Sequence, residues 1–249
     1  APAPVVQPEP APVPVPELPP APDIPVVEPV AEVVPEEEPQ ADAEPEVVVP
    51  EEPPLALEDS DEPVRIELSM AGDSALMESA LTNTDLLQRG AGVIDGFSRG
   101  LVLNKILPVA PPAGKFQTRK VGDTEYIDPA SYARYDSYAR SVAELDTEQL
   151  VSTFHRFRPL LEQAYEALGY ESDELDNALI RSLDQVIATP EIDGDIAVKR
   201  KEAVYIYIDP ALEQLSPLQK QVLRTGPQNT AKIKGQAVAL REGLLAEAR

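Results

Sequence analysis

The chain has 249 residues and a formal net charge of -23, and most of the negative charge lies at one end. Residues 1–63 contain 17 acidic residues, 19 of the 28 prolines and no lysine or arginine. Such an acidic segment would repel phosphate, so nucleic acid is not an expected partner. The absence of cysteine excludes disulfides, thiolate nucleophiles and cysteine-ligated metals.

Residues 1–63 are predicted to be a disordered, acidic, proline-rich linker. Proline recurs every few positions, and each proline fixes φ and removes an amide donor, so neither a helix nor a sheet ladder can propagate. The simple interpretation is a passive, extended spacer. The alternative is a proline-motif ligand at Pro12–Pro16 or Pro16–Pro19, although the basic flanking residues typical of many such ligands are absent.

A membrane connection is expected only through a segment outside this chain. No run of 18 apolar residues is present, so nothing here is predicted to span a bilayer. The chain starts Ala-Pro-Ala-Pro without an initiator methionine, and a signal or membrane anchor is expected to have preceded the linker.

Residues 64–249 are predicted to form a single, mainly helical, bundle-like domain with a small β-hairpin. Apolar residues at helical spacing and turn residues between them predict helices over 72–81, 84–101, 146–168, 172–187 and 216–225. A further helix is expected to start after Asp128, and a last helix carries Ile233, Ala237, Leu240 and Leu244. The hairpin is expected within Lys115–Asp128, a polar loop over 191–201 and a short strand over 203–208. A kink is expected at Pro159.

The string Tyr-Ile-Asp-Pro-Ala occurs twice, at Tyr126–Ala130 and at Tyr207–Ala211. Aspartate accepts hydrogen bonds from free amides at a helix N-cap, and proline suits the first helical position. Because the flanking residues do not match, the repeat is interpreted as one strand-to-helix turn used twice, and not as a duplication.

No catalytic or metal-binding set is evident. His155 is the only histidine and lies beside Arg156 and Arg158, so a surface position is the favoured interpretation. Glu191–Glu202 faintly resembles a calcium loop, but its glycine is misplaced and Lys199–Lys201 would oppose a cation. No phosphate-binding motif is present, and no cofactor is expected. Glycines at positions 92, 96 and 100 have the spacing used for close helix packing, within the domain or in a dimer.

Two groups of residues are candidate binding residues. Tyrosine and arginine anchor interfaces and bind sugars or carboxylates by stacking and forked hydrogen bonds. The first group follows Asp128 and contains Tyr132, Arg134, Tyr135 and Tyr138, with Asp136 among them. The second lies at a helix-to-helix turn and contains Lys220, Arg224 and Asn229. The structural alternative is that Tyr135 and Tyr138 fill the core, Arg134 pairs with an acid and Asn229 caps the last helix.

Several ordered strings carry a family resemblance: Leu107-Pro108 with Pro111–Phe116, Tyr132–Asp136, Leu161–Tyr170, Ala188–Pro190 and Gln219–Asn229. Over roughly Met70 to Leu245 they resemble the uncharacterised proteobacterial family called domain of unknown function three thousand and fourteen. The resemblance implies an N-terminal membrane segment, a proline-rich linker and then this domain on the periplasmic side of the inner membrane. It implies no activity, and this chain departs from it by lacking the membrane segment.

The leading functional hypothesis is a non-catalytic cell-envelope module that binds a partner protein or the cell wall at the end of an extended linker. One alternative is a hydrolase of wall glycan that uses a pair of acids. The other is a homo-oligomeric scaffold that uses the helix with the spaced glycines.

Overall fold

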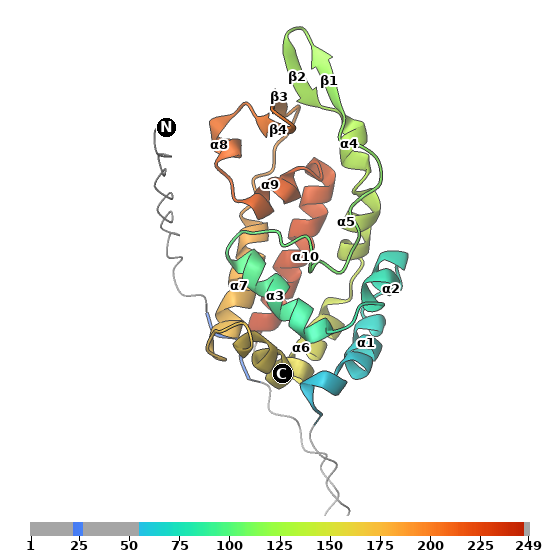
Figure 1. The fold of residues 1–249 in the computed structure, drawn as a ribbon, viewed down its shortest axis with the longest axis vertical. Helices are drawn as coiled ribbons and strands as arrows, with labels where there is room; N and C mark the ends of the chain where they lie inside the picture. Colours follow the sequence, from blue (N-terminus) through green and yellow to red (C-terminus); the bar gives the residue numbers. More distant parts are fainter. Residues whose placement is uncertain (1–21, 27–54, 247–249) are drawn as a thin grey trace, which may run out of the picture.

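The computed structural model describes residues 22–26 and 55–246 (Figure 1). The prediction of disorder for the rest of the linker lies outside these residues. The described part is mainly helical with one small antiparallel sheet, as the sequence predicts. None of the helices in these ranges combines the length and the apolar character needed to cross a bilayer.

The predicted elements occur in the predicted order, but η1 and α1 were not expected, and the helix expected after Asp128 is divided into α4 and α5. The helices are η1 (Leu57–Asp59), α1 (Asp61–Met70), α2 (Ala75–Leu81), α3 (Leu86–Ser98), α4 (Pro129–Ala133), α5 (Asp136–Ala143), α6 (Thr147–Glu166), α7 (Glu174–Ile187), α8 (Pro210–Glu213), α9 (Pro217–Leu223) and α10 (Pro227–Leu245). The strands are β1 (Thr118–Val121), β2 (Thr124–Ile127), β3 (Ala197–Lys201) and β4 (Val204–Tyr207).

One end of the molecule is a helical core built by α1, α3, α6 and α7 (Figure 1). Leucines, alanines and aromatic rings at helical spacing bury one face of each helix, which is the main source of helix stability in a folded protein. The buried set includes Val64, Leu87, Phe157, Leu161 and Leu175. Helix α10 packs along α5, α6 and α7 and connects this core to the other end.

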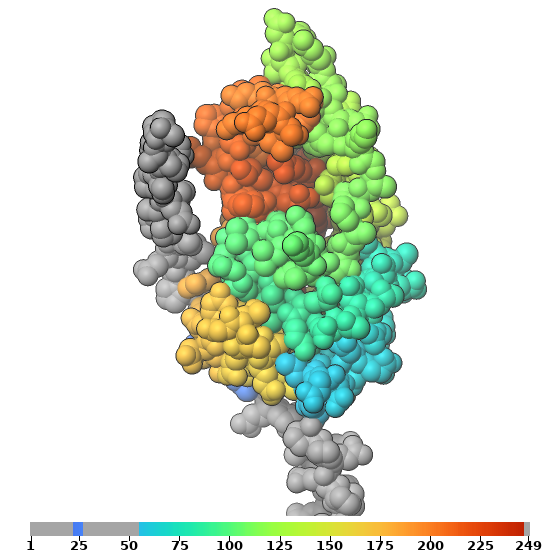
Figure 2. Space-filling model, viewed as in Figure 1, coloured from blue at the N-terminus to red at the C-terminus, as the bar shows by residue number. Residues whose placement is uncertain are grey.

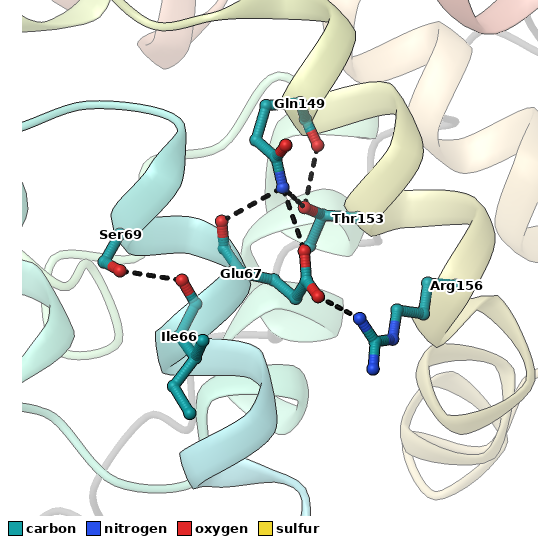
Figure 3. A network of polar contacts seen from close by, with 6 residues as sticks. All are labelled: Ile66, Glu67, Ser69, Gln149, Thr153 and Arg156. Carbon is teal, nitrogen blue, oxygen red and sulfur yellow. Dashed lines mark hydrogen bonds and ion pairs between the residues drawn. The ribbon is translucent and has the colours of Figure 1, made fainter.

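The first helix of the domain begins inside the predicted linker. Helix α1 starts at Asp61 and contains Pro63 in its first turn, where a missing amide donor costs no intrahelical bond. Figure 3 shows how α1 is fixed to α6: Gln149 Nε2 donates to Oε2 of Glu67 over 2.9 Å, and Arg156 pairs with the same carboxylate. The boundary predicted at Pro63 therefore falls within the fold.

The other end is a four-stranded antiparallel sheet in the order β1-β2-β3-β4. In the space-filling view the β1–β2 hairpin projects beyond the β4–α8 region (Figure 2). The sequence predicts a polar loop over 191–201, but its second half is β3. Only Val198 of this strand is buried, and Lys199–Lys201 are exposed, so the apolar alternation that marks a strand is missing. Pairing with β2 and β4 decides the conformation instead.

Several predicted helix starts are confirmed. Asp128 and Asp209 accept from the amides of Ala130 and Ala211, each over 2.8 Å, and Ser216 forms a capping box with Gln219. Four other predicted starts are displaced. Helix α2 begins after Ser74 and α3 after Asp85. Helix α7 begins after Asp173, and α10 begins after Gly226, so that Asn229 lies in its first turn. Gly226 has φ 90°. Residues with a Cβ rarely adopt this angle, so glycine is favoured at the N-cap of α10.

The spaced glycines pack against segments of their own domain. A Cβ at Gly92 would lie 2.9 Å from Ile106, and one at Gly96 would lie 3.0 Å from Leu103. At Gly100, φ is 69° and a Cβ would lie 2.7 Å from Ser216. The helix and the loop after it thus use the small residues for close contact within the chain.

Candidate functional site

The structure brings the two sequence-distant groups of candidate residues to one place. A hollow of about 410 Å³ opens between the start of α4 and α5, the turn that joins α9 to α10, and the loop before β3. Figure 1 shows α5 beside α10 in this part of the molecule. The hollow is lined by Pro129, Tyr132, Ala133, Asp136, Gly194, Asp195 and the run Thr225–Asn229. It contains Tyr132 of the first group and Asn229 of the second.

Asn229 joins the two groups directly. Its side chain is buried, and Nδ2 donates to the carboxylate of Asp136 over 2.8 Å, to the carbonyl of Thr225 over 3.0 Å and to the carbonyl of Tyr132 over 3.3 Å. A buried amide with partners on both elements fixes the turn before α10 relative to the start of α5. Asn229 therefore positions one wall of the hollow.

Gly226 and Tyr132 line the hollow and lie in close contact with each other. A Cβ on residue 226 would lie 2.5 Å from Cγ of the Tyr132 ring, so only glycine lets the turn approach the ring this closely. The Tyr132 hydroxyl is buried and has no hydrogen-bond partner among the described residues. Burial is the main cause that raises the pKa of Tyr132 to about 12, so the phenol is neutral at physiological pH.

The hollow carries two carboxylates, and both already have partners. Asp195 forms an ion pair with Arg119 of β1, and Asp136 accepts from Asn229. General acid catalysis needs a carboxyl group that is free to give up a proton to a substrate atom. The arrangement favours non-covalent binding of a polar group against a tyrosine ring.

The other members of the first group hold the chain together near the hollow. Arg134 donates to the carbonyls of Gly114 and Ser131 over 2.9 and 3.3 Å, and not to an acid. The Tyr138 hydroxyl donates to the carbonyl of Ala110 over 3.0 Å, and the Tyr135 ring lies between the Arg134 guanidinium and the Tyr138 ring. These contacts attach the loop after α3 to α4 and α5.

The other members of the second group surround Tyr207 and do not reach the hollow. Lys220 Nζ donates to the carbonyl of Glu213 over 2.9 Å and pairs with its carboxylate, and Arg224 lies over the Tyr207 ring. Burial acts to raise the pKa of Glu213, but the Tyr207 amide and Lys220 outweigh it and lower that pKa. Lys220 and Arg224 therefore stabilise the packing of α8 and α9 on β4.

His155 and two acidic residues of the calcium-like loop make packing contacts or ion pairs within the domain. His155 lies in α6 with its ring edge-to-face on Phe154, and burial followed by Arg158 lowers its pKa. Glu191 pairs with Lys234, and Asp195 pairs with Arg119. Within residues 22–26 and 55–246, no group of three or more acidic or histidine side chains lies close enough to hold a metal ion.

Sequence reasoning missed the third wall of the hollow, which contains Gly194 and Asp195. The Arg119–Asp195 pair joins residues 76 positions apart, and nothing in the local sequence around either residue indicates that they meet. Gly226 is different, because a Gly-Pro pair between two helical patterns indicates a special backbone conformation.

The structure is a mainly helical domain with a small sheet and an open hollow lined by three chain segments. A family model described as "Protein of unknown function (DUF3014)" matches residues 86–241, and the chain belongs to this family. The matched range contains Tyr132, Asp136, Asp195 and Asn229, all from the hollow. No curated protein and no solved structure matches the chain.

Proposed function

We propose that this protein is a non-catalytic interaction module of the bacterial cell envelope. The acidic, proline-rich linker connects the domain to the inner membrane, and the domain binds a partner protein or the cell wall on the periplasmic side. The hollow between α4, α5 and the start of α10 is the binding surface.

The observation that supports a binding role is that three separate chain segments line one hollow. Three segments from different parts of the chain meet there, and glycine at position 226 allows the close contact with Tyr132. The partners of both carboxylates, Arg119 and Asn229, hold the walls in place. A preformed concave surface with few polar groups is the usual form of a binding site.

A photo-crosslinking residue placed at Gln228 tests the proposed surface in the full-length protein in intact cells. Gln228 is exposed and lines the hollow. The matched control is Gly235 in the same helix, which is exposed and whose Cβ would contact nothing within 4 Å. We expect a reproducible adduct from position 228 that is several-fold stronger than any adduct from position 235.

The product identifies the kind of partner. A discrete band that survives digestion of the wall indicates a protein, and a product that lysozyme digestion removes indicates the wall itself. Gln228→Trp should abolish capture by a probe at an adjacent rim position, because indole fills the hollow, whereas Gly235→Trp should not. Equal adducts from positions 228 and 235 would contradict a binding role for the hollow.

A wall-glycan hydrolase is the second candidate, because Asp136 and Asp195 line the same hollow. Glycosidases use two carboxyl groups on either side of the scissile bond. Purified full-length protein would then release soluble fragments from isolated peptidoglycan, and Asp136→Asn or Asp195→Asn would stop the release. We expect no release above the level given by the double variant.

A further inference from the structure

A five-residue piece of the linker packs against the helical core. Residues 22–26 lie beside the lower part of the molecule in Figure 1, separated in sequence from the rest of the described chain. Ile24 is 2 % exposed, whereas Pro22, Asp23 and Val26 are exposed, and Val26 is 72 % exposed. One side chain of this segment is therefore inserted and its neighbours are not.

The groove that receives Ile24 is formed by α6, α7 and α10. Ile24 forms a buried cluster with Ile180 of α7 and Leu244 of α10, around which lie the partly buried Val151, Phe154, Leu179, Leu183, Leu240 and Leu245. This cluster is separate from the hollow near Tyr132, which lies at the other end of the domain. Removing an isoleucine side chain from water is a substantial driving force for this contact.

A polar contact fixes the backbone of the same residue. The Ile24 backbone hydrogen-bonds to the carboxylate of Asp176, which is 5 % exposed and also pairs with Arg158 over 2.6 Å. Burial raises the pKa of Asp176, while Arg158 and the Ile24 backbone act to lower it, so the segment favours the ionised form of a buried carboxylate. The groove thus recognises both a side chain and a main-chain amide.

The sequence of the linker singles out this segment. Ile24 is the only isoleucine in residues 1–63, and prolines stand at positions 22 and 25 on either side of the Asp-Ile pair. Proline restricts the unbound chain, so less conformational freedom is lost when the segment binds. A single anchor is enough in this setting, because linkage to the domain gives a local concentration of the order of millimolar.

We propose that the groove of α6, α7 and α10 is a binding site for the linker segment Pro22–Val26, which latches the linker to its own domain. The latch controls how far the domain reaches from whatever lies before the linker. Only 21 residues precede Pro22, whereas 54 precede Leu55. At about 3.4 Å per residue, release of the latch raises the maximum reach from about 70 Å to about 180 Å. This inference does not depend on the partner proposed for the hollow.

The absence of cysteine allows a direct measurement on the full chain. Spin labels on Asp23→Cys, exposed within the segment, and on Asp173→Cys, exposed just before α7, report the distance across the latch. We expect a short, narrow distance distribution, which Ile24→Asp replaces by a long, broad one as the latched population falls roughly tenfold or more. Val26→Asp places the same charge at the exposed neighbour and should leave the short distance unchanged, and Ile24→Leu should retain it.

Binding in trans provides the second measurement. A fluorescent peptide with the sequence of residues 20–28 should bind the Ile24→Asp chain at least about tenfold more tightly than the wild-type chain, whose groove the linker already fills. A peptide that carries the same Asp substitution should not bind. A short distance that persists in Ile24→Asp, or equal binding of the peptide to both chains, would overturn the latch. Circular dichroism of the Ile24→Asp chain, together with its binding of the wild-type peptide, shows whether the helices that form the groove remain folded.

Discussion

The same five residues, Tyr-Ile-Asp-Pro-Ala, end two different strands of the sheet and are used in opposite orientations. At Tyr126–Ala130, Ile127 is 1 % exposed and the Tyr126 ring lies under the Arg119 guanidinium on the outer face. At Tyr207–Ala211, Tyr207 is 3 % exposed and Ile208 is 44 % exposed. Identical local sequence thus gives identical turns but opposite burial.

Strand pairing explains the reversal. Residues directly opposite in an antiparallel pair point to the same face, and neighbours along a strand point to opposite faces. Tyr207 lies opposite Val198, which is 2 % exposed and faces the core, whereas Tyr126 lies opposite Ala197, which faces the other way. A difference of one residue in register exchanges the inner and outer side chains.

The largest expected effect comes from truncating the two isoleucines. Ile127→Ala should lower the free energy of unfolding by about 2–5 kcal/mol, because it leaves a cavity in a buried cluster. Ile208→Ala should cost about 1 kcal/mol or less, because much of that side chain is already in water. Urea unfolding of the full chain, followed by circular dichroism, measures both. Equal losses would mean that the two turns are used in the same way.

Alkaline pH should lower the free energy of unfolding through Tyr207, the buried tyrosine of the second Tyr-Ile-Asp-Pro-Ala string. Burial raises the pKa of Tyr207 to about 12, against an opposing effect of Arg224. Between pH 10 and pH 12 the unfolded chain loses this proton while the folded chain keeps it, so stability is present below pH 10 and falls as pH rises. The loss is at most about 1.4 kcal/mol per pH unit for each such group.

Unfolding free energies between pH 9 and pH 11.5 measure this loss. Burial also raises the pKa values of Tyr132 and Tyr165 to about 12, so Tyr207→Phe should reduce the slope without removing it. An unchanged slope in Tyr207→Phe would show that the second copy does not bury its phenol.

The two aspartates should behave alike, in contrast to the isoleucines. Asp128→Ala and Asp209→Ala each remove one N-cap hydrogen bond of 2.8 Å, and each should cost about 1 kcal/mol. Asp→Asn at either position keeps an acceptor and should cost much less. Thermal or urea unfolding of the four variants tests whether the local turn is equivalent in both copies, and losses that differ by more than 1 kcal/mol would contradict it.

The smallest expected difference concerns the phenol oxygens at neutral pH. Tyr207→Phe removes a hydrogen bond of 3.3 Å to the carbonyl of Lys220 and should cost about 0.5 kcal/mol, the low end of the range for such a bond. Tyr126→Phe keeps the ring under Arg119 and should change stability by less than that. The comparison requires replicate unfolding curves, and a larger loss for Tyr126→Phe would reverse the assignment of the two faces.

The sequence predicted parts of the candidate site but not their meeting. Tyr132 and Asn229 were identified from residue type and from their positions after Asp128 and at a helix-to-helix turn. Their contact depends on α10 packing along α5, which no local pattern encodes. Asp195 and Arg119 could not be paired beforehand, because charged residues are common in this chain and 76 positions separate the two.

The sequence by itself determined most of the helices, the hairpin and the strand-to-helix turns, because capping residues, prolines and apolar spacing act over a few residues. It did not give α1 or the break between α4 and α5, and its linker boundary at Pro63 lies inside α1. Only the tertiary structure decided that Lys199–Lys201 belong to a strand, that Ile24 packs on the domain and that Ile127 and Tyr207 face inward. In each case the deciding contact comes from a residue far away in the chain, so local preference alone could not select the outcome.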